Sequence, residues 1–132
     1  SYPEMMSAVT AGYERAKKET GIEARFIFTC VRHYGAETAL RVAKIARDNP
    51  HPLVTGFGMA GDENVGAVSD FKPAFDISGL PNRTAHAGEA SGPDSVRQAR
   101  DILGVRRFGH MVRAIEDPEL LQELVKIKAV PE

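Results

Sequence analysis

The chain has 132 residues, of which 42% are hydrophobic and 27% charged. This composition is ordinary for a globular protein, and the length allows one domain with a modest core. The formal net charge of −1 gives no reason to expect nucleic acid or an anionic membrane surface as a partner. The single cysteine, Cys30, cannot form an internal disulfide, which fits a reducing compartment such as the cytoplasm. Every apolar run is shorter than the ~18 residues that a membrane-spanning helix needs.

Helical and extended patterns alternate along the chain. In chain order, apolar spacing and turn residues predict a helix over residues 1–21, a strand at 24–30, a helix at 35–47, a strand at 52–57, a helix at 69–78, a strand at 82–86, a helix at 93–103, a strand at 105–110 and a helix from 118 onward. Successive units recur at intervals of roughly 25 to 30 residues, as expected for βα units with parallel strands. The fold class predicted is therefore α/β, in one domain that spans residues 1–132.

Polar and glycine-rich segments follow each predicted strand. The carboxyl ends of parallel strands meet at one edge of a sheet, and that edge is the usual ligand site of α/β barrels and open sheets. Two histidines, His86 and His110, each stand where a short strand ends, and Glu89 follows the first of them by three residues. Either histidine alone could simply cap its strand. The pair together with Glu89 favours a functional site.

A glycine-rich segment runs from Gly58 to Glu63. Glycines let a backbone approach a ligand closely, but this segment has neither of the common phosphate-binding motifs. A structural tight turn explains the glycines equally well. Its two acids, Asp62 and Glu63, argue against bound phosphate and suit a neutral or weakly basic ligand better.

Five segments in order resemble the middle of an adenosine deaminase. They are 54–63 (VTGFGMAGDE), 84–89 (TAHAGE), 92–96 (GPDSV), 107–110 (RFGH) and 112–118 (VRAIEDP). The resemblance implies a zinc-dependent metallo-hydrolase with an eight-stranded (βα) barrel, of which this chain would be a fragment with about four of the eight strands. It also implies hydrolytic deamination of adenosine to inosine and ammonia, with a purine nucleoside as the small-molecule partner.

The resemblance assigns roles to four positions. His86 resembles a ligand of the single Zn²⁺, and Glu89 resembles the general acid that protonates the purine ring. His110 resembles the residue that orients the attacking water, and Gly61 resembles a backbone donor to the ring. The family completes its zinc site with an HxH pair and an aspartate, and neither matches a residue of this chain. Zinc lowers the pKa of a bound water to about 7, and the acid needs a pKa raised by burial.

Two alternatives to adenosine deamination stay open. The substrate could be another 6-aminopurine compound, although the Ala60–Glu63 segment favours adenosine deaminase proper over the adenine deaminases. The chain by itself could also be a non-catalytic half-barrel. An unclosed four-stranded sheet leaves two edges and an uncovered apolar inner face, so we expect self-association through that face.

Overall fold

The computed structural model describes all residues from 1 to 132, and it consists of helices and strands in alternation. The strands are β1 (Phe26–Val31), β2 (Val54–Ala60), β3 (Asn82–Ala87), β4 (Arg107–His110) and β5 (Val130–Pro131). The α-helices are α1 (Tyr2–Thr20), α2 (Gly35–Asp48), α3 (Val68–Ile77), α4 (Pro93–Leu103) and α5 (Pro118–Lys126), and two short 3₁₀ turns cover Arg32–Tyr34 and Val112–Glu116.

The strands form one parallel sheet in the order β1-β2-β3-β4-β5. The four predicted strands are therefore confirmed as parallel neighbours in chain order. The fifth strand was not predicted. It has two residues, one of them a proline, and is held to β4 by the Val130 N–H, which donates to the Arg106 carbonyl at 2.8 Å. Two residues are too few to show the alternation by which a strand is recognised in a sequence.

The second strand is longer than predicted. The prediction ended it at residue 57, but β2 continues to Ala60, so the loop begins at Gly61 instead of Gly58. Gly58 lies inside the strand, at a position where its neighbours leave no room for a side chain. A Cβ there would lie 2.8 Å from Thr84 Cγ2 and 3.3 Å from Ile27 Cγ2. This glycine thus serves close packing inside the sheet and is not part of a ligand loop.

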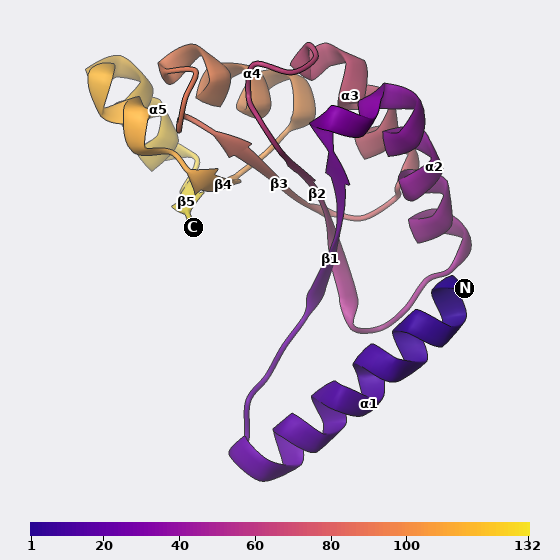
Figure 1. The fold of residues 1–132 in the computed structure, drawn as a ribbon. Helices are drawn as coiled ribbons and strands as arrows, with labels where there is room; N and C mark the ends of the chain where they lie inside the picture. The colour runs from indigo at the N-terminus through magenta and orange to yellow at the C-terminus, as the bar shows by residue number, and fades with distance from the viewer.

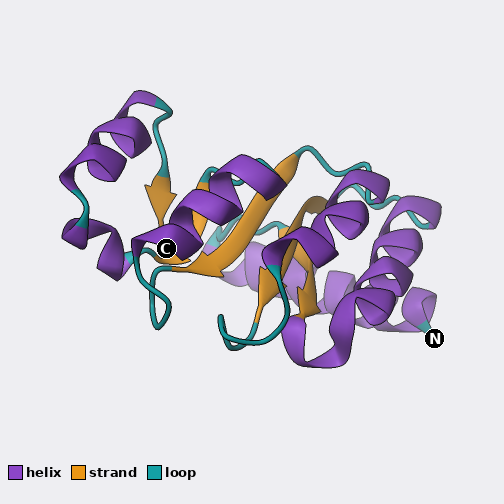
Figure 2. Ribbon diagram, turned by 90° about the horizontal axis from the view of Figure 1, so that it is seen from above, coloured by secondary structure: helices purple, strands orange, loops and turns teal.

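The helices lie on one side of the sheet, and adjacent helices pack against each other there (Figures 1 and 2). Between them and the sheet lies the core, where Phe57 of β2 meets Phe75 of α3 edge to face at 5.1 Å. Both phenylalanines are fully buried. Helix α1 stands apart from the others (Figure 1) and is attached to β1 through aromatic pairs, such as Tyr2 with Phe28 at 5.2 Å.

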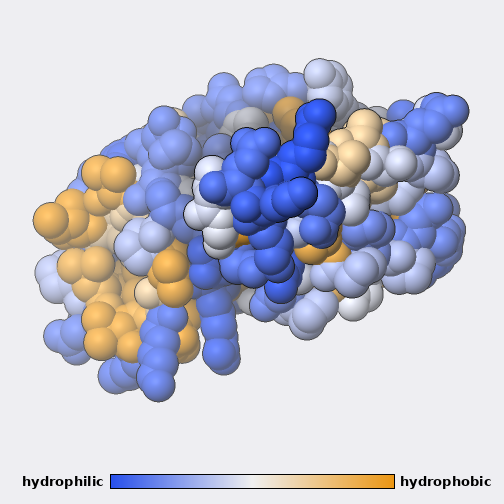
Figure 3. All heavy atoms as spheres, turned by 90° about the horizontal axis from the view of Figure 1, so that it is seen from below, coloured by the Kyte–Doolittle hydropathy of each residue, from blue (hydrophilic) through white to orange (hydrophobic).

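The opposite face of the sheet has no covering layer. Ile27 and Thr84 of this face lie around Gly58, and Ile27 is 42% exposed. Around Gly58 this face carries Thr29 and Thr84 beside Ile27, so it is less apolar there than expected. The larger apolar surface lies instead on the side of the C-terminal elements (Figure 3). The exposed aliphatic side chains of those elements are Val112, Ile115, Val125 and Val130. No helix of the structure is long and apolar enough to cross a membrane.

Candidate active site

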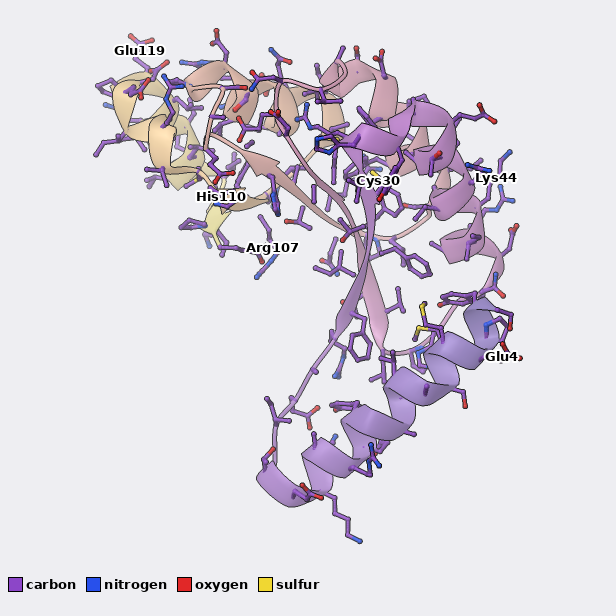
Figure 4. The ribbon with its side chains drawn as sticks, viewed as in Figure 1. Glu4, Cys30, Lys44, Arg107, His110 and Glu119 are labelled. Atoms are coloured by element: carbon purple, nitrogen blue, oxygen red, sulfur yellow. The ribbon has the colours of Figure 1, made fainter.

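The two histidines meet at the carboxyl edge of the sheet. Pairing of β3 with β4 places His86 opposite Gly109, and His110 follows at the end of β4 (Figure 4). Their ring centroids are 4.8 Å apart and the ring planes are almost perpendicular, at 89°. The prediction that these histidines share one edge of the sheet is thus confirmed.

The absence of a side chain at residue 109 makes this contact feasible. A Cβ on Gly109 would lie 2.7 Å from His86 Cδ2, closer than two carbon atoms can approach. The chain then turns sharply, with His110 at φ 69° and Met111 at φ 54°. Such left-handed conformations cost a non-glycine residue about 1 to 3 kcal/mol each. Two bonds from the Met111 N–H, to the carbonyls of Ala87 and Gly109 at 3.0 Å, help to hold the turn.

Glu89 reaches the same place from the loop after β3. Its Oε2 lies 3.3 Å from His110 Nε2, so the acid and the imidazole are within reach of a shared proton. The Glu89 side chain is 61% exposed. The buried environment expected for this acid is therefore not provided by these 132 residues, because the inner side of the rim is open to solvent.

Glu63 is a part of the site that the sequence analysis did not recognise. Its carboxylate accepts the Glu89 N–H at 2.8 Å and the Ser91 N–H at 2.9 Å, so it joins the loop after β2 to the loop after β3. Glu63 is only 9% exposed. Burial acts to raise the pKa of its carboxyl, but the N–H donors of Glu89 and Ser91 outweigh burial and lower that pKa. The buried carboxylate is therefore held in its ionised form.

Arg32, directly after β1, lies beneath the same loops and was also missed. It is 2% exposed, and its Nη1 donates to the main-chain carbonyls of Glu63 at 3.1 Å and Gly66 at 3.3 Å. A sequence signal did exist, since an arginine and a glutamate that follow neighbouring strands have to come near each other at the shared edge. Their main-chain partners leave no pattern in the sequence.

Gly61 lies at this edge but not beside the histidine pair. It has φ 102°, and a Cβ there would lie 2.9 Å from His33 Nδ1 and 3.3 Å from the Arg32 nitrogen. The structure thus brings His86, Glu89 and His110 together and places Gly61 against the turn after β1. This leaves its predicted role in substrate binding untested.

The cluster does not fit a complete zinc centre by itself. A zinc site takes three or four protein ligands. No group of three or more His, Cys, Asp or Glu side chains in the chain is arranged to hold a metal ion. The histidine pair and Glu89 supply part of a ligand set at most. The cysteine is no substitute, because Cys30 is 2% exposed and burial raises the pKa of its thiol to about 11.

Comparison with known proteins agrees with this geometry. Residues 1–130 match the model of the adenosine deaminase family. The chain belongs to that family.

Among curated relatives, an adenine deaminase from Agrobacterium fabrum is 48% identical over 130 residues, which make up 96% of this chain and 40% of that protein. An adenine deaminase from a Chelativorans species is 50% identical over 116 residues, or 86% of this chain and 35% of that protein. The chain thus spans about 40% of the length of the relatives it matches.

Solved structures support the barrel assignment. A zinc-bound amidohydrolase from Burkholderia ambifaria superposes with a TM-score of 0.91 at 27% identity, over 99% of this chain and 37% of that one. An adenine deaminase from Arthrobacter aurescens superposes with a TM-score of 0.83 at 26% identity, over 93% of this chain and 38% of that one. The partial barrel expected from the sequence is therefore confirmed. These relatives are named adenine deaminases, whereas the Ala60–Glu63 segment led us to expect an adenosine deaminase proper.

The contact between Gly109 and His86 can be tested directly. We expect Gly109→Ala to push the His86 ring away and to destabilise the fold by about 1 to 3 kcal/mol, as overpacking does. The measurements are the NMR shifts of the His86 and His110 ring protons and denaturant unfolding. Gly12→Ala in α1 is the control, because a Cβ there meets nothing within 4 Å and should stabilise the helix. Unchanged ring shifts in Gly109→Ala would contradict the close contact.

Proposed function

We propose that the complete protein is a hydrolase that removes the amino group of a 6-aminopurine, with adenine favoured over adenosine. The observation that carries the proposal is the cluster of His86, His110 and Glu89 at the carboxyl rim, in a chain 48% identical to an adenine deaminase. Deamination of a ring amidine needs a proton donor to the ring and a positioned water. A carboxyl group beside an imidazole can supply both functions.

In this proposal Glu89 donates a proton to a ring nitrogen, which makes the amino-bearing carbon electrophilic. His110 orients the attacking water and takes part in its deprotonation. The 3.3 Å separation of His110 Nε2 from Glu89 Oε2 lets a proton pass between them. The water oxygen forms a bond to the ring carbon and gives one proton through His110 to Glu89, which restores the acid. The second water proton passes to the amino group, the carbon–nitrogen bond breaks and ammonia leaves, while the proton donated by Glu89 stays on the ring nitrogen. A purine with a carbonyl group in place of the amine remains.

We further propose that His86 is one ligand of a Zn²⁺ ion whose other ligands come from segments outside these 132 residues. Such an ion, when bound, lowers the pKa of its water and so supplies a nucleophile near neutral pH. The zinc-bound amidohydrolase with the same fold supports this assignment. We also propose that Gly61, which lies on the same rim with φ 102°, offers its main chain to the purine ring.

The substrate is tested with the complete, zinc-loaded protein. Ammonia release and the change in ultraviolet absorbance are measured with adenine, adenosine and AMP in parallel. We expect a kcat/KM for adenine at least tenfold above that for adenosine, because the 48% identical relative is an adenine deaminase. A preference for adenosine would overturn the substrate assignment. No ammonia from any 6-aminopurine would overturn the function.

The role of Glu89 is tested by Glu89→Gln. We expect this variant to keep its zinc and to lose at least ~10²-fold in kcat, the usual effect of removing a general acid. Glu119→Gln in α5 is the control. The Glu119 side chain is exposed and lies away from the site (Figure 4), and its substitution changes the charge by the same amount. Near-normal turnover by Glu89→Gln would show that Glu89 only ends a strand.

The 132 residues taken alone should be inactive. Because no three potential ligands come together, we expect no stoichiometric zinc and no deamination. We also propose that the separate chain associates with a second copy, which would cover the open face of the sheet and the apolar side of the C-terminal elements. Metal analysis, the adenine assay and the mass in solution check these points. One zinc per monomer with measurable turnover would contradict them.

A further inference from the structure

We propose that Glu63 is a positioning residue that sets the place of Glu89 by gripping the main chain of its loop. The inference rests on the proposed function, since it takes Glu89 to be the proton donor. Glu63 belongs to the loop after β2, whereas the residues it holds belong to the loop after β3. One carboxylate therefore links two adjacent loops at the rim.

The geometry is that of a two-pronged clamp. Oε1 accepts the N–H of Glu89 at 2.8 Å, and Oε2 accepts the N–H of Ser91 at 2.9 Å. Holding two alternate amides with one rigid, planar group fixes the direction of the backbone between them. The Glu89 side chain leaves the backbone at the first of these two points. Its carboxylate then lies 3.3 Å from His110 Nε2.

The surroundings favour an ionised Glu63. Arg32 lies beneath it, and Arg113 contributes a second positive charge nearby. The carboxylate is 9% exposed, so its charge is stabilised by hydrogen bonds and these two cations more than by solvent. Burying a carboxylate costs free energy unless its oxygens accept hydrogen bonds, and each donor that is lost leaves buried charge without a partner.

The loop is also held by bonds whose two partners do not include Glu63, although Gly88 and Ser95 act on its carboxylate as well. The Gly88 N–H donates to Ser95 Oγ at 2.7 Å, and the Gly88 carbonyl accepts the Arg113 N–H at 2.8 Å. Arg113 Nη1 also donates to the Ala90 carbonyl at 2.5 Å. Without the Glu63 clamp the loop would remain attached at these points, and only the segment that presents Glu89 would be released. Loss of Glu63 should therefore misplace the acid without unfolding the site.

The test compares Glu63→Gln with Asp117→Asn in the complete, zinc-loaded protein. Asp117 is a matched control, since its carboxylate also accepts two main-chain N–H groups, those of Glu119 and Leu120 at 3.1 and 3.0 Å, but at the start of α5. We expect Glu63→Gln to lower kcat by about 10- to 10²-fold, as a misplacement of roughly 1 Å does. KM and zinc content should stay near normal, and hydrogen exchange should quicken at the amides of Glu89 and Ser91. Asp117→Asn should leave all of these unchanged.

A double variant separates positioning from general damage. If Glu63 acts through Glu89, Glu63→Gln should cause no further loss in kcat when Glu89 is already glutamine. The same loss in both backgrounds, a fall in zinc content that matches the fall in kcat, or normal kcat in Glu63→Gln would each overturn the inference. If Glu89→Gln has full activity, the proposed function itself fails. A large effect of Glu89→Gln with none of Glu63→Gln would refute only the clamp.

Discussion

A glycine opposite a histidine sets the geometry of the rim. The parallel register of β3 and β4 puts Gly109 beside His86, and the missing Cβ leaves the space that the imidazole ring fills. The perpendicular contact with His110 depends on that space, and so does the position of His110 within reach of Glu89. Gly58 plays a similar part further from the rim. Because it has no side chain, the inner side chains of β1 and β3 can pack close together over β2.

The sequence predicts the architecture well because the spacing of apolar residues and the residues that end helices and strands are local signals. Four strands and five helices follow from apolar spacing and from glycine and proline stops, and parallel neighbours follow from short right-handed connections. Errors occur where tertiary packing decides. The strand β2 runs past Gly58 because Met59 is buried there, and β5 is defined only by its bonds to β4.

The candidate site divides in the same way. His86, Glu89 and His110 are recognisable from the sequence because their side chains carry the chemistry and stand at strand ends. For Glu63 and Arg32 the sequence indicates only that they come near each other, because they act on main-chain atoms of loops remote in sequence. A carboxylate that grips amides and one that faces solvent look identical in a sequence. The open environment of Glu89 is likewise decided by what surrounds the rim, and no local pattern encodes it.

The two borders of the sheet have unequal capacity to pair with another strand. On the β5 side, the N–H groups of Val130 and Glu132 both turn inward to the carbonyls of Arg106 and Phe108. The residue between them, which turns its nitrogen outward, is Pro131 and has no hydrogen to donate. On the β1 side, six residues line the border without such a block. Pro131 therefore leaves the outer border of β5 without an amide donor at the position where a further strand would use one.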